Sequence, residues 1–225
     1  MAWHVPAGGK AITGLFHRMW YHQKQRTWWS EDTTWLGTRV MKSPFDLWIY
    51  QEILARVRPD LIIETGTNFG GGAFYLASIC DLLDHGRVLT VDIRNRPDLP
   101  QHPRITYIEG SSTAPEVVER IRAHAADTTM VILDSSHKCD HVLQELDCYG
   151  PMVSPRSYMV VEDTHLNGHP VSPRFGPGPM EALEKWLPAH PEFRVDTQCE
   201  KFFMTWHPRG YLQRRVDLAA QGQEA

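Results

Sequence analysis

The chain has 225 residues, of which 42% are hydrophobic and 22% are charged, as in an ordinary globular domain. A chain of this length can bury roughly 70% of its unfolded surface without disulfides or structural metals. The net charge of −4 argues against a nucleic-acid partner, and the lack of any run of 18 apolar residues argues against a membrane span.

Apolar runs rich in β-branched residues alternate with helical patterns from residue 60 onward. Strands are expected at residues 61–63, 88–91, 105–108, 130–133, 158–161, 193–195 and 202–206. Helices are expected at residues 44–57, 73–83, 115–126, 140–149 and 179–187. Continuous apolar strands separated by helices predict an α/β fold whose seven-stranded, mostly parallel sheet is covered on both faces. The short connection between the last two strands predicts an antiparallel C-terminal hairpin.

Three regions follow from this pattern. Residues 1–43 show weak periodicity and are expected to be an N-terminal extension that acts as a lid or an interface segment. Residues 44–215 are expected to form the main domain, and residues 216–225 a flexible tail.

A glycine-rich turn follows the first strand of the predicted sheet. A dinucleotide fingerprint starting at Gly66 would need glycine where Asn68 stands, and a Walker A loop would need lysine directly after Gly71. Both motifs fail at defining positions. What remains is an acid, Glu64, before a glycine cluster that opens a helix. This arrangement lets a ligand approach backbone N–H groups while the carboxylate meets a cation; a plain tight turn with a surface acid is the alternative.

The turn resembles motif I of S-adenosylmethionine-dependent methyltransferases, which share a Rossmann-like fold. The resemblance implies that Glu64 lies near the methionyl ammonium, Asp92 at the ribose hydroxyls, and Ser111 and Ser112 at the adenine. The residues that it assigns to cofactor binding are Glu64, Thr65, Gly66, Thr67, Asn68, Gly71, Asp92, Ser111, Ser112 and Asp134.

Acidic residues also directly follow two later strands of the predicted sheet. Asp134 follows the fourth, and Glu162 and Asp163 follow the fifth. Neighbouring strand ends meet in a parallel sheet, so these carboxylates could converge, and hard oxygen ligands suit Mg²⁺ or Ca²⁺ better than zinc. Each acid alone could equally be a helix cap or a solvated loop residue. His137 lies one turn from Asp134, where a neutral imidazole is a natural general base.

The combined pattern resembles the cephalosporin hydroxylase family, and it is similar to macrolide-sugar and rhamnosyl O-methyltransferases. The resemblance covers residues 41–212 and is carried by the segments 43–48, 64–68, 134–137 and 161–164. It implies that Asp134, Glu162 and Asp163 hold Mg²⁺ and that His137, with Asp134, is catalytic. The implied reaction is methyl transfer from S-adenosylmethionine to a hydroxyl of a small natural product or deoxysugar in secondary metabolism, such as antibiotic biosynthesis.

Two rival functions belong to other classes. An iron oxygenase would need two histidines and a carboxylate, which His137, His141 and Asp134 could formally supply. A non-catalytic S-adenosylmethionine-binding subunit would have no need of the acids. His141, His165 and His169 are otherwise expected to be structural or to line a substrate site.

Six of the eight tryptophans lie within the first 48 residues, and the first 50 residues carry +3, which leaves −7 for the rest. Trp28, Trp29 and Trp35 are expected to cover the sheet edge or line an acceptor site, with packing in a subunit interface as the alternative. Arg39 and Lys42 could contact the diphosphate of a nucleotide sugar. The four cysteines form no CxxC pair, and the N-terminus lacks a signal-peptide layout, so a cytoplasmic location is expected. A homo-oligomer is a separate expectation.

Overall fold

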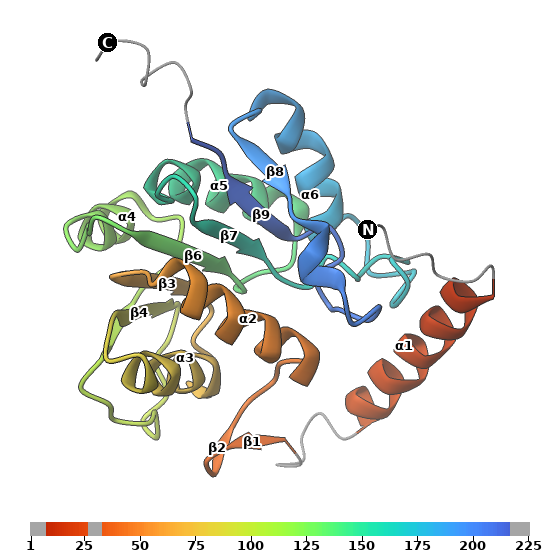
Figure 1. The fold of residues 1–225 in the computed structure, drawn as a ribbon, viewed down its shortest axis with the longest axis horizontal. Helices are drawn as coiled ribbons and strands as arrows, with labels where there is room; N and C mark the ends of the chain where they lie inside the picture. Colours follow the sequence, from red (N-terminus) through yellow and green to blue (C-terminus); the bar gives the residue numbers. More distant parts are fainter. Residues whose placement is uncertain (1–7, 27–32, 217–225) are drawn as a thin grey trace.

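A seven-stranded sheet with helices on both faces forms the body of the protein (Figure 1). The computed structural model describes residues 8–26 and 33–216. The sheet has the order β5-β4-β3-β6-β7-β9-β8. Its strands are β3 (Leu61–Thr65), β4 (Arg87–Asp92), β5 (Ile105–Glu109), β6 (Thr129–Leu133), β7 (Tyr158–Val161), β8 (Phe193–Val195) and β9 (Tyr211–Arg214). The helices that cover it are α2 (Pro44–Val57), α3 (Gly71–Leu82), α4 (Pro115–Arg122), α5 (Cys139–Tyr149) and α6 (Pro179–Trp186).

The apolar strands are buried because each face of the sheet has its own hydrophobic core. Helices α2 and α3 cover one face, and α4, α5 and α6 cover the other. Strands β5, β4, β3, β6 and β7 are parallel, and Thr65 at the end of β3 pairs with Val91 on one side and Leu133 on the other. The carboxyl ends of the central strands therefore lie at one edge, where ligands bind in such sheets. The expected α/β sheet is confirmed.

The last predicted strand is wrong. Residues 202–206 form turns and irregular backbone, and Phe203 has a left-handed φ of 65° that breaks an extended run. The strand lies instead at β9, which is antiparallel to both β7 and β8. Tyr211–Arg214 has only two apolar residues followed by two polar ones, a weaker strand signal than the apolar run at 202–206, and that run misled the prediction.

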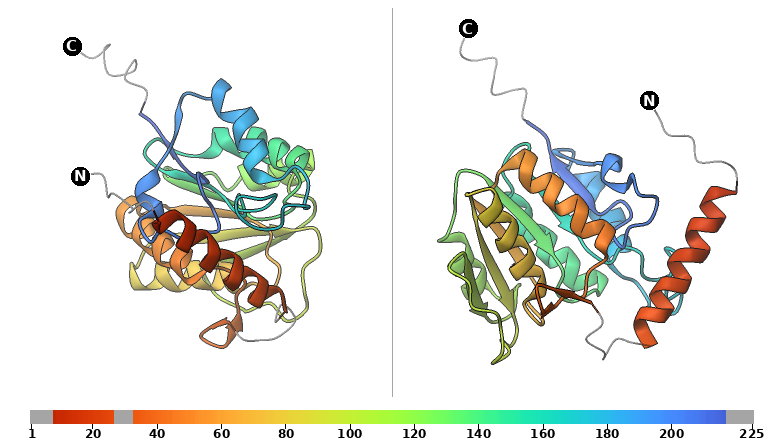
Figure 2. Two further views of the ribbon diagram at one scale, coloured as in Figure 1. Left: turned by 90° about the vertical axis from the view of Figure 1, so that its right-hand side faces the viewer. Right: turned by 60° about the horizontal axis from the view of Figure 1, so that its bottom comes forward.

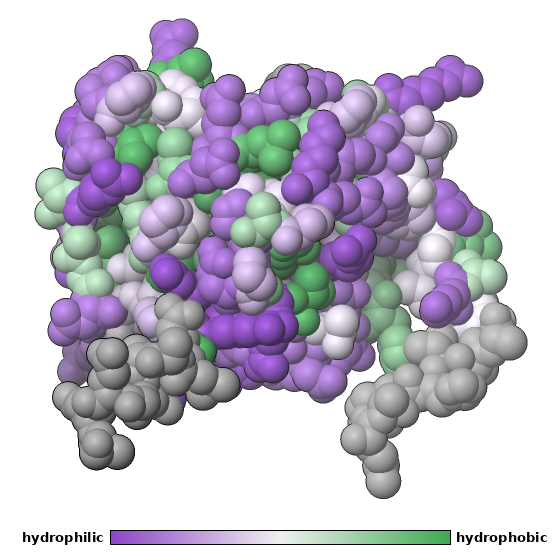
Figure 3. Space-filling view, turned by 90° about the horizontal axis from the view of Figure 1, so that it is seen from above, coloured by the Kyte–Doolittle hydropathy of each residue, from purple (hydrophilic) through white to green (hydrophobic). Residues whose placement is uncertain are grey.

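The N-terminal part contains a helix and a small hairpin that the weak periodicity did not indicate. Helix α1 (Gly9–Arg26) runs beside the body, and most of its length stands clear of the sheet in Figure 1 and in the right-hand view of Figure 2. The strands β1 (Thr34–Trp35) and β2 (Thr38–Arg39) form an antiparallel pair. No helix among the described residues is long and apolar enough to cross a membrane. The face seen in Figure 3 is mostly hydrophilic, with apolar residues in small separate patches.

Candidate active site

A cavity of about 520 Å³ opens at the carboxyl edge of the sheet. Its wall is formed by the ends of β3, β4, β6 and β7, the residues after β5, the 39–42 segment and one residue of α1. Among the predicted site residues, those that line it are Gly66, Asn68, Asp92, Ser111, Ser112, Asp134, His137 and Asp163. Thr67 and Gly71 line a small adjoining recess together with Glu64.

Gly66 allows two strand ends to approach closely. Its φ is +91°, and a Cβ there would lie 1.9 Å from the carbonyl oxygen of Asp134. The Asp134 N–H in turn donates to the carbonyl oxygen of Thr65 at 3.0 Å and to its hydroxyl at 3.2 Å. Glycine is therefore required sterically at the turn, and Thr65 supports the end of β6 rather than lining the cavity.

Glu64 is a buried carboxylate with one unused oxygen. Its Oε2 accepts from the Thr90 hydroxyl at 2.8 Å, whereas its Oε1 has no hydrogen-bond partner among the described residues. Burial raises the pKa of Glu64 to about 7, and the nearby Lys42 ammonium only partly offsets this. An unpaired buried acceptor beside glycine-rich backbone fits a ligand ammonium, because such a group would supply the missing donor.

The far side of the cavity carries hydroxyl and amide groups. The backbone N–H of Asn68, whose φ is +47°, donates to Asp92 Oδ2 at 2.9 Å, so the turn after β3 fixes the acid at the end of β4. Ser112 Oγ lies 3.1 Å from Nε2 of His141, which also lines the cavity. These positions suit recognition of a ribose and a base edge.

Asp134, His137 and Asp163 converge at the cavity, whereas the set expected from the sequence to hold a metal was Asp134, Glu162 and Asp163. One ligand atom from each of the three lies within 4.8 Å of the others, close enough to hold one metal ion. The His137 ring lies 3.3 Å from Asp163 Oδ2. The N–H of Asp163 donates to Nδ1 of the buried His207 at 3.0 Å, which anchors this strand end. Burial, reinforced by the charge of Glu162, raises the pKa of Asp134 well above its usual range.

Glu162, the third acid of the predicted set, lies beneath the cavity wall and bonds to protein groups. Its Oε1 accepts from Lys42 Nζ at 2.6 Å and from the Tyr50 hydroxyl at 2.6 Å. Burial favours its neutral form, but Lys42, His207 and these hydrogen bonds outweigh burial and lower the pKa of Glu162. The sequence suggested that Lys42 could contact a diphosphate. Its ammonium is instead surrounded by carboxylates, so it is not placed to do so.

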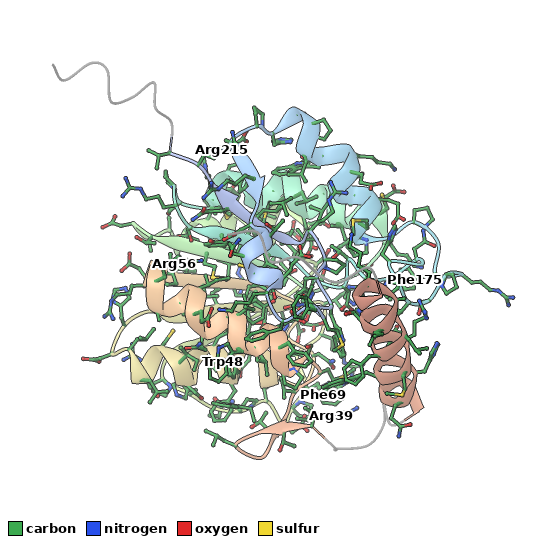
Figure 4. All side chains as sticks on the ribbon, turned by 45° about the vertical axis from the view of Figure 1, so that its right-hand side comes forward. Arg39, Trp48, Arg56, Phe69, Phe175 and Arg215 are labelled. Atoms are coloured by element: carbon green, nitrogen blue, oxygen red, sulfur yellow. The ribbon has the colours of Figure 1, made fainter. Side chains whose placement is uncertain are left out.

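The tryptophan-rich N-terminal segment contributes less to the cavity than predicted. Trp35 packs edge-on against Tyr75, with ring centroids 4.8 Å apart, and its indole donates to Ser78; it does not line the cavity. Trp28 and Trp29 lie outside the described residues. Arg39 does line the cavity, and its guanidinium carbon lies 4.0 Å from the Phe69 ring centroid. The two labelled residues lie next to each other in Figure 4.

Helix α1 supplies an unpredicted wall. Tyr21 lines the cavity, as does Trp206, and it packs with Leu166, Val171 and the nearby Phe175 labelled in Figure 4. One turn earlier, His17 Nε2 lies 2.9 Å from Nδ1 of His165, and burial lowers the pKa of His17 to about 4. The sequence gives no signal for this pair, because its members are 148 residues apart.

An iron site built from His137, His141 and Asp134 is not formed. His141 Nε2 contacts Ser112 and lies 3.7 Å from Glu145, and His141 is absent from the metal-capable group. His141 lines the cavity, which leaves both of its expected roles, structural or lining a substrate site, open, whereas the oxygenase geometry is absent from the described residues.

Known proteins resemble this chain over most of its length. The family model for rhamnosyl O-methyltransferase/CmcI matches residues 27–215. Curated rhamnosyl O-methyltransferases of Mycobacterium tuberculosis (strain ATCC 25618 / H37Rv) and Mycobacterium leprae (strain TN) are each 39% identical over 213 residues, which is 91% of this chain and 85% and 91% of theirs. The chain belongs to this family. Its activity is therefore O-methyl transfer, as the sequence predicted, and the hydroxylase alternative is not favoured.

Solved structures give the same fold. The apo structure of CmcI-N160 matches with a TM-score of 0.67 and 20% identity, over 83% of this chain and 77% of that one. MycE from the mycinamycin biosynthetic pathway, in complex with Mg and SAH, matches with a TM-score of 0.51 and 19% identity, over 74% of this chain and 48% of that one. The expected Rossmann-like methyltransferase fold is thus confirmed.

Proposed function

We propose that the protein transfers a methyl group from S-adenosylmethionine to a hydroxyl of a sugar or glycosylated natural product and that it uses Mg²⁺. The observation that carries this proposal is the position of Asp134, His137 and Asp163 on the wall of the same cavity as Gly66 and Asp92. The rhamnosyl O-methyltransferase relatives and the MycE complex with Mg and SAH support the sugar class and both cofactors.

The residues present fit the proposed cofactor. Glu64 offers an unpartnered buried oxygen for the ammonium, and Asp92 offers a carboxylate for the ribose hydroxyls. Gly66 keeps the turn free of side chains. The rest of the proposed set is Thr67, Asn68, Gly71, Ser111, Ser112 and Asp134, and Thr65 contributes by supporting the end of β6. The cofactor supplies the reactive methyl group on its sulfonium.

The same cavity fits a hard divalent ion. Asp134 and Asp163 offer carboxylate oxygens, which Mg²⁺ prefers, and Glu162 is the third proposed ligand. Bound there, the ion would lower the pKa of an acceptor hydroxyl and orient it. Because Glu162 Oε1 already accepts from Lys42 and Tyr50, its share in the site is the least direct of the three.

His137 is the proposed general base. Its ring reaches the cavity and lies 3.3 Å from Asp163 Oδ2, a carboxylate that can orient it and stabilise the charge gained on taking the hydroxyl proton. The aromatic wall of Tyr21 and Trp206 is suited to the apolar face of a sugar ring.

The test is transfer of a labelled methyl group to rhamnosylated acceptors, with Mg²⁺ and with excess chelator. Wild-type protein should be active only with the ion. His137→Ala should lose about 10²- to 10⁴-fold in rate while binding S-adenosylhomocysteine normally. Full activity of this variant would remove His137 from the base role, and full activity in chelator would remove the metal.

The proposal extends to the setting of the enzyme. We infer a cytoplasmic homo-oligomer in secondary metabolism, such as antibiotic biosynthesis. Free thiols at all four cysteines support a reducing compartment. Light scattering on the purified protein tests the assembly; a monomeric mass at all concentrations would contradict it.

A further inference from the structure

Lys42 places an ammonium group at the centre of the acids of the site. Its Nζ lies 2.6 Å from Glu162 Oε1, 2.7 Å from Asp134 Oδ2 and 3.8 Å from Glu64 Oε1. The residue is only 6% exposed. A buried ammonium that contacts three carboxylates is an internal ion cluster and not a surface pair, so its charge is weakly screened.

This ammonium joins the two halves of the proposed site. Glu64 belongs to the cofactor side, whereas Asp134 belongs to the group that can hold a metal. With Glu162 and Asp163, the cluster has four carboxylates against the single positive charge of Lys42.

We propose that Lys42 is the resident counter-cation of this acid cluster and keeps its carboxylates together when neither ligand is bound. The inference rests on the proposed function for the identity of the ligands, but not for the cluster itself. Several buried carboxylates repel one another and pay a desolvation cost, which a positive charge at hydrogen-bond distance offsets. Lys42 thus opposes Mg²⁺ electrostatically, since both interact with Asp134 and Glu162.

A purely orienting role for Lys42 predicts the opposite effect on the metal. If the ammonium served mainly to fix the carboxylate rotamers, removing it would weaken Mg²⁺ binding, as loss of a supporting partner does in many metal sites. A counter-cation, when removed, leaves an excess of negative charge that attracts the ion more strongly. The sign of the change in Mg²⁺ affinity separates the two roles.

The experiment compares thermal unfolding of wild type, Lys42→Met and Lys42→Arg in excess chelator and in saturating Mg²⁺. Lys201→Met, which removes an exposed lysine from its ion pair with Glu52, is the matched control for loss of one charge. In chelator, Lys42→Met should unfold about 6–15 °C below wild type, since it leaves buried carboxylates uncompensated. Lys42→Arg should recover part of this loss, and Lys201→Met should stay within about 2 °C of wild type.

Mg²⁺ should raise the unfolding temperature of Lys42→Met more than that of wild type. By titration calorimetry, the variant should bind the ion at least about tenfold more tightly. One charge a few ångströms from a divalent ion has an effect of that size even in a water-like dielectric, and burial of Lys42 weakens the screening further. An unchanged melting temperature in chelator, or weaker Mg²⁺ binding by the variant, would overturn the proposal.

If Lys42→Met folds poorly, the double variant Lys42→Met/Glu162→Gln still tests the proposal. Removing one carboxylate charge together with the ammonium should restore stability relative to Lys42→Met alone, and a double variant no more stable than the single one would refute the charge balance. Methyl transfer and S-adenosylhomocysteine binding by wild type are measured in parallel. Their absence would count against the proposed function, whereas the melting comparison in chelator tests Lys42 independently.

Discussion

Replacing Gly66 by alanine should separate the strand ends that form the site. The backbone at +91° costs an L-residue about 1–2 kcal/mol, and the added Cβ would lie 1.9 Å from the carbonyl oxygen of Asp134. Backbone cannot rotate away as a side chain can, so relief requires a shift of the 134–135 segment, with a further cost of about 1–3 kcal/mol. The sum of about 2–5 kcal/mol predicts a fall in melting temperature of roughly 10 °C for a domain of this size.

Gly176→Ala is the matched control, because Gly176 has a similar φ of +86° and no atom within 4 Å of the added Cβ. It should cost only the conformational part, about 1–2 kcal/mol or roughly 3–6 °C. Thermal unfolding and calorimetric binding of S-adenosylhomocysteine check both variants, and only Gly66→Ala should bind more weakly. Equal losses of stability in the two variants, with unchanged binding in both, would refute the steric argument.

Three further predictions concern buried polar groups. Burial raises the pKa of Glu64 from 4.5 to about 7, so the stability that its protonated carboxyl contributes is complete below pH 4.5 and is lost as the pH rises through 7. In chemical denaturation, the free energy of unfolding of ligand-free wild type should fall by up to about 3 kcal/mol between pH 5 and 8 relative to Glu64→Gln. A difference between the two proteins that does not change with pH would contradict this. The Asp46 carboxylate is buried and accepts three hydrogen bonds from the 205–211 segment, so Asp46→Ala should lower the free energy of unfolding by about 3 kcal/mol, whereas a loss below 1 kcal/mol would show that these bonds contribute little. His17→Ala removes the 2.9 Å contact to His165, and hydrogen exchange across residues 9–26 should quicken while the global melting temperature changes little; unchanged exchange would show that other contacts hold α1.

The central sheet and most of its edge were predictable because their signals are local. Acids such as Asp134 stand directly after apolar runs, and parallel strands bring such positions together whatever the details of packing. The glycine-rich sequence around Gly66 is likewise enough to predict a turn in which two backbone segments approach closely.

The interior contacts of the site depend on long-range packing and were not predictable. Lys42 lies 92 and 120 residues from Asp134 and Glu162, and nothing in its own neighbourhood distinguishes it from a surface lysine. The strand predicted at 202–206 is wrong for a related reason. Thr205 and Trp206 form hydrogen bonds to Asp46 and do not pair with a strand of the sheet.

The placement of β9 between β7 and β8 has a consequence for how the chain folds. Strand β8 pairs only with β9 in the sheet, so the edge formed by the last two strands cannot exist until residues 211–214 have emerged. The hydroxyl of Tyr211 also contacts Asp46 of α2, 165 residues earlier. Closure of such distant contacts is slow relative to local helix formation, so completion of the sheet during synthesis should wait for the last strand to leave the ribosome.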